Sequence, residues 1–228
     1  MTITSTGLTK AAGAAAAVAG TLYVAVQIKH PAMTGASAET TEWVVRSCAK
    51  IVLAALGLAG ITGMYLRQYR RTGVLGLLGY LLFAVGLLIM FSVVVIAAAV
   101  LPALTHSNPG YVNDVIVTAD GGHPVGDIGG MQTVLYAQAL GYVGGGLLFG
   151  IALFRAGVLA RWASALLAVG AACTAALAVL PDSFNRPIAV PVGIALIGLG
   201  VSLWRNPRDR AAATVSAASA PVPEPAAR

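Results

Sequence analysis

Long stretches without a charged side chain recur along the chain, and six of them are between 16 and 42 residues long. A helix needs about 20 predominantly apolar residues to cross the hydrocarbon core of a bilayer. The longest stretch contains turn-forming residues at 104–110, so it predicts one spanning helix followed by a loop. We therefore predict an all-α, polytopic membrane bundle with six transmembrane helices, near 8–28, 44–66, 73–103, 131–154, 159–180 and 187–204.

The lysines and arginines set the orientation of these predicted helices. With the N-terminus in the cytoplasm, ten of the 14 basic residues fall on the cytoplasmic side, and the basic sequence at 67–71 contributes most to this excess. Cytoplasmic loops of membrane proteins are enriched in Lys and Arg. The chain is therefore predicted to be a multi-pass protein of the cell membrane with both termini in the cytoplasm.

The composition agrees with contact with a lipid bilayer and excludes several classes of protein. Hydrophobic residues make up 58% of the chain and charged residues only 10%, whereas about 25% of a soluble domain is charged. This excludes an ordinary soluble enzyme and a disordered protein. The net charge of +6 follows from the membrane topology, so no nucleic-acid partner is expected. Two cysteines are too few for a disulfide scaffold, and we expect both to be packed thiols.

The predicted domain organisation is simple. Residues 1–207 form the transmembrane domain, with the longest loop at 104–130 on the outer side, and the Ala/Ser/Pro-rich segment 208–228 is predicted to be a disordered cytoplasmic tail. The Ala-rich first segment also has features of a signal peptide. A retained helix is favoured because its apolar run continues to Val26 without a clear cleavage boundary.

Helix 131–154 is rich in glycine, with Gly141 and Gly145, and Gly146 and Gly150, four residues apart. In lipid, small residues at this spacing let two helix backbones approach closely. Close packing within one bundle is the simpler interpretation, and a surface for a substrate or a partner is the alternative.

Polar residues gather at the outer end of the predicted bundle. Glu42, Arg46 and Lys50 share one face of a helix. They either form a salt-bridged stripe that sets the depth of the helix, or direct Lys50 or Arg46 inward to a polar substrate group. Trp43, at the same end, is typical of an interface anchor. Other polar residues predicted at this end are Gln27, Lys29, His30, Gln132, Tyr136 and Gln138.

Two outer connections add further polar groups. The loop 104–130 contains His106, Tyr111, Asp114, Asp120, His123 and Asp127. Its segment 112–117 is predicted to cover the mouth of the bundle as a short helix or strand. The spacing of the Asp and His residues matches no standard metal-binding pattern, so no metal is expected. In the connection 181–187, Asp182 either caps the last helix or pairs with Arg186, or is held with Asn185 at the outer mouth.

Three segments carry a resemblance to known proteins. Residues 63–68 (GMYLRQ), 147–162 (LLFGIALFRAGVLARW) and 180–200 (LPDSFNRPIAVPVGIALIGLG) resemble a group of small six-helix actinobacterial membrane proteins. Similar small bacterial membrane proteins include integral-membrane terpene cyclases that act on farnesylated substrates. The resemblance implies terpenoid biosynthesis, with a protonation-initiated cyclisation of a lipophilic, prenylated substrate and no cofactor. The acid motifs of the soluble class I and class II cyclases do not occur in the chain.

Such a reaction needs a carboxylic acid in a dry site and aromatic faces for the cation. The candidate catalytic acids are Asp182, Asp127, Asp114 and Glu42. The candidate substrate-binding residues are Lys50, Arg46, His123, Tyr136, Asn185, Tyr111 and Phe184. Two other functions remain open, a small transporter or permeability protein and a non-catalytic membrane subunit or scaffold.

Overall fold

The computed structural model describes residues 4–175 and 185–205, with the side chains of Asn185 and Arg186 left out. These residues form helices and contain no strand, so the predicted all-α class is confirmed for the described part of the chain. The elements are α1 (Ser5–Ala25), a 3-10 helix η1 (Gly35–Glu39), α2 (Thr41–Ala99), α3 (Leu101–Leu104), α4 (Pro109–Ala119), α5 (Gly130–Ala156), α6 (Arg161–Ala175) and α7 (Asn185–Arg205). Four of these helices, α1, α2, α5 and α7, are long and apolar enough to cross a membrane.

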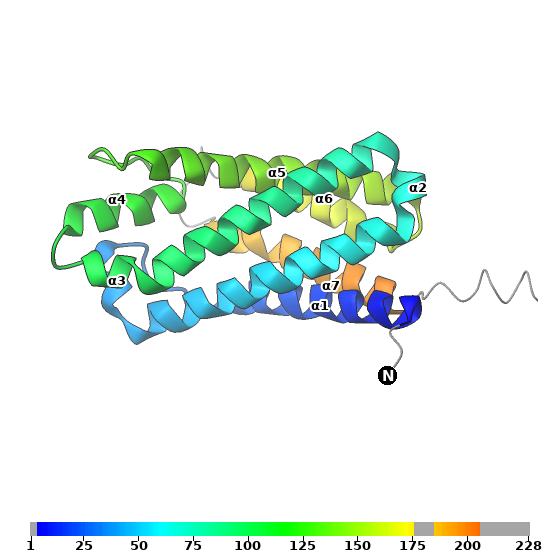
Figure 1. Ribbon diagram of the computed structural model, residues 1–228, viewed down its shortest axis with the longest axis horizontal. Coiled ribbons are helices and arrows are strands. Elements are labelled where there is room, and N and C mark those ends of the chain that lie inside the picture. The colour runs from blue at the N-terminus through cyan, green and yellow to red at the C-terminus, as the bar shows by residue number, and fades with distance from the viewer. Residues whose placement is uncertain (1–3, 176–184, 206–228) are drawn as a thin grey trace, which may run out of the picture.

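The element α2 has 59 residues and consists of two helical halves that together form a hairpin. Its backbone leaves the helical region at Gln68 and at Gly73, and Figure 1 shows the chain reversing there. Gly73 has a φ of 59°, a left-handed value that glycine adopts without strain. The reversal falls beside the basic sequence at 67–71, between two predicted spans.

Neighbouring helices in the bundle run antiparallel and approach closely through small residues. Where α1 meets α7, a Cβ atom on Gly13 would lie 2.7 Å from the carbonyl oxygen of Gly200, and Gly20 faces Gly193 in the same way. The start of α1 and the end of α7 therefore lie at the same end of the bundle, where α2 also reverses (Figure 1). We call this the reversal end.

The glycines of α5 pack against two different helices. Gly141 and Gly145 face the second half of α2 at Gly86 and Phe83, and Gly146 and Gly150 face α6. Both glycine pairs are therefore used for packing within one bundle. Since lipid removes most of the hydrophobic driving force between helices, close van der Waals contact of this kind holds them together.

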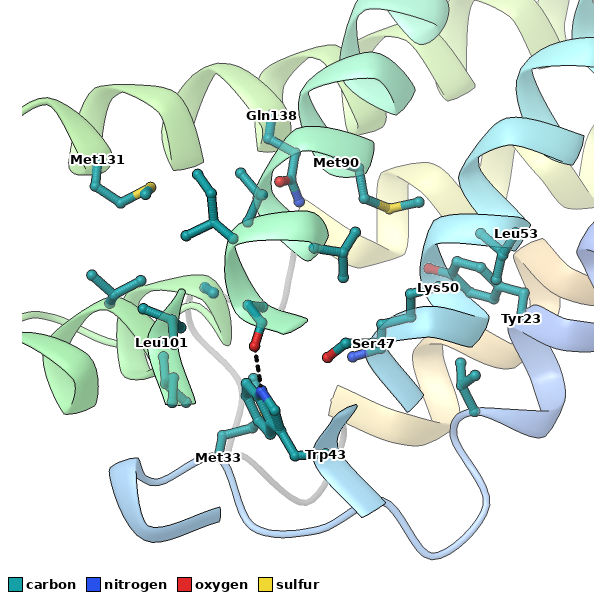
Figure 2. A pocket seen from close by; sticks show the side chains of 18 of the residues that line it. Tyr23, Met33, Trp43, Ser47, Lys50, Leu53, Met90, Leu101, Met131 and Gln138 are labelled. Atoms are coloured by element: carbon teal, nitrogen blue, oxygen red, sulfur yellow. Dashed lines mark hydrogen bonds between the residues drawn. The ribbon is translucent and has the colours of Figure 1, made fainter. Parts of the chain in front are cut away.

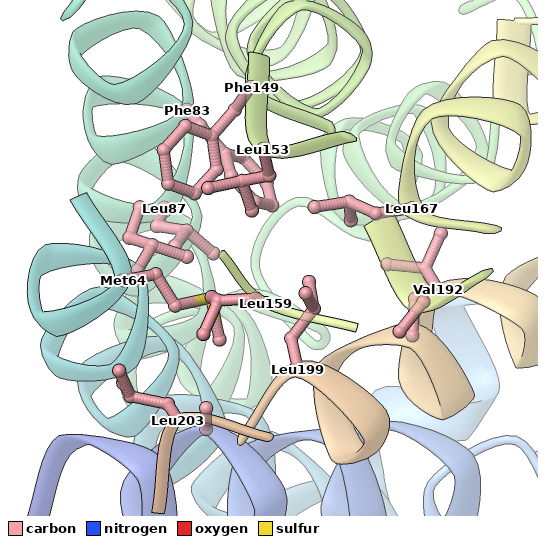
Figure 3. Packing of buried hydrophobic residues seen from close by; sticks show 14 of the residues in the cluster. Met64, Phe83, Leu87, Phe149, Leu153, Leu159, Leu167, Val192, Leu199 and Leu203 are labelled. Atoms are coloured by element: carbon pink, nitrogen blue, oxygen red, sulfur yellow. The ribbon is translucent and has the colours of Figure 1, made fainter. Parts of the chain in front are cut away.

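The main apolar core lies inside the bundle and is drawn from all the long helices (Figure 3). Its fully buried side chains include Met64, Phe83, Phe149, Leu167 and Leu199. Around it, many large apolar side chains are exposed on the outside of the bundle. An apolar exterior of this extent fits contact with lipid.

The opposite end of the bundle, which we call the cap end, carries η1, α3 and α4 (Figure 1). Helix α2 ends at Ala99, before its predicted end at 103, because Pro102 lacks the N–H group that would continue the helix. Asn108 then caps α4 by accepting a hydrogen bond from the backbone N–H of Tyr111. The segment 112–117, for which the sequence allowed a helix or a strand, is helical and buries Val112, Val115 and Ile116 in a second apolar cluster.

Candidate functional site

A cavity of about 240 Å³ lies at the cap end, beneath α4 (Figure 2). It is bounded by the end of α1, both ends of α2, and parts of α3, α4 and α5. Most of its lining is apolar, and includes Met33, Leu53, Met90, Leu101, Ile116 and Met131. The polar residues in its wall are Tyr23, Gln27, Trp43, Ser47, Lys50 and Gln138. Ligand pockets of about 300–1,000 Å³ are usual for drug-sized molecules, so this cavity fits a small ligand or one end of a longer one.

Trp43 forms one wall of the cavity and also ties the two ends of α2 together. Its side chain is 6% exposed, and its Nε1 atom donates a hydrogen bond of 2.8 Å to the carbonyl oxygen of Ala97. The carbonyl groups in the last turn of a helix lack helical donors, and the indole satisfies this one. The prediction that Trp43 is an interface anchor is therefore wrong, since the ring packs inside the cap.

Lys50 brings a positive charge to the cavity wall. Its Nζ atom lies 3.1 Å from Nε2 of His30. The other ring nitrogen of His30, Nδ1, lies 2.9 Å from the carbonyl oxygen of Pro31 and so carries the proton that it donates. Nε2 is then the acceptor, and the ammonium group of Lys50 donates to a neutral imidazole.

A pair of tyrosines lies where the cavity meets the bundle core. The hydroxyl of Tyr142 donates a hydrogen bond of 2.8 Å to the hydroxyl of Tyr23, and the two rings are nearly parallel. Because Tyr23 accepts this bond and lines the cavity, its own O–H group can donate to a molecule inside.

Two residues of the cavity wall carry a buried amide oxygen without a partner. Oε1 of Gln27 and Oε1 of Gln138 make no hydrogen bond to any residue that the structure describes. Buried polar atoms in native proteins are nearly always paired. These two oxygens are therefore the least satisfied polar groups in the cavity wall.

Of the predicted face formed by Glu42, Arg46 and Lys50, only Lys50 lines the cavity. Arg46 instead donates to the carbonyl oxygens of Val26 and Lys29, at 2.9 and 3.0 Å, and forms an ion pair of 2.7 Å with Glu42. A cation that binds the last carbonyls of a helix stabilises its C-terminus. Arg46, paired with Glu42 on the same helix, thus fastens the end of α1 and the segment after it to α2.

The candidate residues of the loop 104–130 lie outside the cavity wall. Asp114 accepts a hydrogen bond of 2.8 Å from the backbone N–H of Gly126, and Asp127 accepts one of 2.7 Å from that of Gly129. Tyr111 packs against the apolar cluster under α4, and His123 is exposed. These contacts shape the loop, and none of these four residues is among those lining the cavity beneath α4.

The remaining candidates divide between the exterior and the part of the chain outside the described residues. Tyr136 is 54% exposed, and its hydroxyl accepts a hydrogen bond from Gln132. Asp182 and Phe184 lie outside the described residues, as does the predicted tail. Asn185 begins α7, and its side chain is not described.

Comparison with protein-family models, with curated proteins and with solved structures finds no match. The chemistry of the site therefore follows from its own residues. One wall offers hydrogen-bond donors and a positive charge, two amide oxygens offer acceptors, and the remainder is apolar and aromatic.

Sequence reasoning overlooked Trp43 and Ser47 as parts of this site. A signal for them exists, because Trp43, Ser47 and Lys50 are spaced i, i+4 and i+7 and so share a helix face. The two cysteines, Cys48 and Cys173, are free and exposed, so the expectation that they are packed thiols is wrong.

Proposed function

We propose that the protein crosses the cell membrane six times, through α1, the two halves of α2, α5, α6 and α7, with both termini in the cytoplasm. The support is the position of the basic residues. At the reversal end, the helices carry the basic residues Lys10, Arg67, Arg70, Arg71, Arg155, Arg161 and Arg205. By the positive-inside rule this end faces the cytoplasm, and the cap end with its cavity faces outward.

Within this topology, the proposed function is that of an integral membrane enzyme acting on a lipophilic, prenylated substrate. The observation that supports it is the cavity beneath α4, which combines apolar walls with the aromatic rings of Trp43 and Tyr23. An isoprenoid chain fits such walls, and aromatic faces stabilise a carbocation. Since 240 Å³ is small for a whole farnesylated molecule, one end of the substrate occupies the cavity and the remainder lies between helices, where it entered from the bilayer.

The proposed reaction is a protonation-initiated cyclisation, with Asp182 as the acid. Among the described candidate acids, Glu42, Asp114 and Asp127 already bind a guanidinium or a backbone N–H group. This favours Asp182, which belongs to the connection that follows α6 and precedes α7. The end of α6 and the start of α7 both point toward the cap end.

The test is a conversion assay. Membranes containing the full chain are incubated with a farnesylated indole and analysed by mass spectrometry. Cyclisation gives an isomer of unchanged mass and new retention time, which is absent with Asp182→Asn and present with the control Asp120→Asn. Unchanged substrate from correctly inserted protein refutes cyclisation of this substrate class.

A further inference from the structure

The strongest unexplained feature of the cavity is the pair of amide oxygens that have no partner. Gln27 stands just beyond the end of α1 and Gln138 lies on α5, so the two come from different walls of one cavity. Figure 2 shows the Gln138 side chain extending from α5 toward the cavity. Each oxygen is buried and accepts no hydrogen bond from the described residues.

The other polar groups of the cavity do not supply the missing bonds. The indole of Trp43 donates to Ala97, and Lys50 donates to His30. The hydroxyl groups of Tyr23 and Ser47 make no bond to either oxygen. The remaining walls are largely Met, Leu, Val and Ile side chains, which have nothing to donate. A buried acceptor left without a donor is costly, and it is retained in a protein where a ligand or an ordered water completes it.

We infer that the ligand of this cavity is a lipophilic molecule whose polar end carries a hydroxyl or N–H donor that binds Gln138, Gln27 or both. This inference rests on the proposed function, because it names the substrate class of the same site. A hydroxyl suits the cavity in both directions, since it donates to a glutamine while accepting from Lys50 or Tyr23. An ether can only accept, so its lone pairs would face those of the glutamine oxygens.

The substrate class can be tested with two molecules that differ in one donor, farnesol and farnesyl methyl ether. Trp43 serves as the reporter, because it lines the cavity and the other two tryptophans, Trp162 and Trp204, are exposed near the reversal end. The full chain carrying Trp162→Phe and Trp204→Phe is placed in nanodiscs, and Trp43 emission is titrated with each molecule. Affinities are expressed as mole fraction in the lipid, so that different partitioning does not enter the comparison.

Farnesol is expected to bind about tenfold more tightly than the ether, which is the change that one hydrogen bond of ordinary strength makes. The preference falls to about one with Gln27→Leu and Gln138→Leu combined. The matched control is Gln132→Leu, which lies on the same helix as Gln138 but bonds to Tyr136 outside the cavity. It keeps the tenfold preference.

A second readout separates this role from a structural one. Because Gln138→Leu removes a buried acceptor that nothing completes, the empty protein is expected to melt at a higher temperature while its preference for farnesol decreases. A glutamine that served only folding would lower the melting temperature when replaced.

The outcomes distinguish the inference from the proposed function. Equal binding of the alcohol and the ether to the protein with both glutamines refutes the donor inference and leaves the proposed function standing. A preference that survives the double glutamine variant also refutes it. If neither molecule changes the emission of Trp43, the cavity does not bind isoprenoids, and the proposed function fails with the inference. An alcohol preference without any cyclised product supports the inference and refutes the reaction.

Discussion

The ammonium group of Lys50 lies 3.1 Å from Nε2 of His30, so a cation near the cap end of the bundle is held by a neutral imidazole. The bond joins the start of α2 to the segment that leaves α1. It fixes the Lys50 side chain in the wall of the cavity beneath α4, where a charge is costly without partners.

Replacement of His30 tests this relationship. His30→Ala removes an acceptor of a charged donor and is expected to lower the free energy of unfolding by about 1–2 kcal/mol. The measurement is thermal unfolding in detergent. His106→Ala is the control, because His106 is exposed. Equal melting temperatures for the two variants would show that the contact contributes nothing to stability.

Arg46 is expected to resist even a conservative replacement. Its guanidinium reaches one carbonyl group at the end of α1 and one in the segment that follows, as well as the carboxylate of Glu42. Lysine offers a single ammonium group and cannot reproduce this fork. Arg46→Lys should therefore cost about 1–2 kcal/mol of stability, measured by chemical unfolding. Arg70→Lys, at an exposed position, should cost much less, and a similar loss in both would argue against the clamp.

Two adjacent glycines of α5 give a matched test of helix packing. A Cβ atom at Gly145 would meet the backbone of Phe83, which cannot move aside, whereas one at Gly144 would meet only the end of the Leu82 side chain. Gly145→Ala is expected to destabilise the bundle by about 1–3 kcal/mol. Gly144→Ala should cost clearly less, as a side-by-side melt would show. Equal losses would mean that α2 and α5 do not rely on this close approach.

The cavity can be filled from its own wall. Ser47 is 4% exposed and lines it, so Ser47→Phe places a ring where a ligand would lie. We expect farnesol binding, followed by Trp43 emission, to weaken at least tenfold. Ser92→Phe makes the same exchange on the exposed face of the same helix and should leave binding unchanged. Unaltered binding to a folded Ser47→Phe protein would place the ligand elsewhere.

The topology is open to cysteine labelling in a Cys48→Ala, Cys173→Ala background. Val125 is 97% exposed at the cap end, so Val125→Cys is expected to react with an impermeant maleimide added to intact cells. Arg70→Cys, at the reversal end, should react only after the cells are opened. The opposite pattern would reverse the proposed orientation.

The sequence was informative where a property is local. The charge-free stretches and the basic sequence at 67–71 placed the helices and the reversal of α2, and the glycine spacing in α5 predicted its close packing. Pro102 and Asn108 are local signals of the same kind for the breaks before and after α3. Such features depend on a few consecutive residues, so they can be predicted from the sequence without knowing which helices pack against one another.

The tertiary structure alone decided which of the polar groups at the cap end meet. The bond from Trp43 to Ala97 joins residues 54 positions apart, and that from Tyr142 to Tyr23 joins residues 119 positions apart. In the folded protein, the Arg46 side chain binds the end of α1, whereas Lys50, three residues after Ser47, lines the cavity. The sequence determined that hydrogen-bonding groups gather at one end of an apolar bundle. Their pairing depends on how antiparallel helices distant in the chain pack against one another, and no local pattern contains that information.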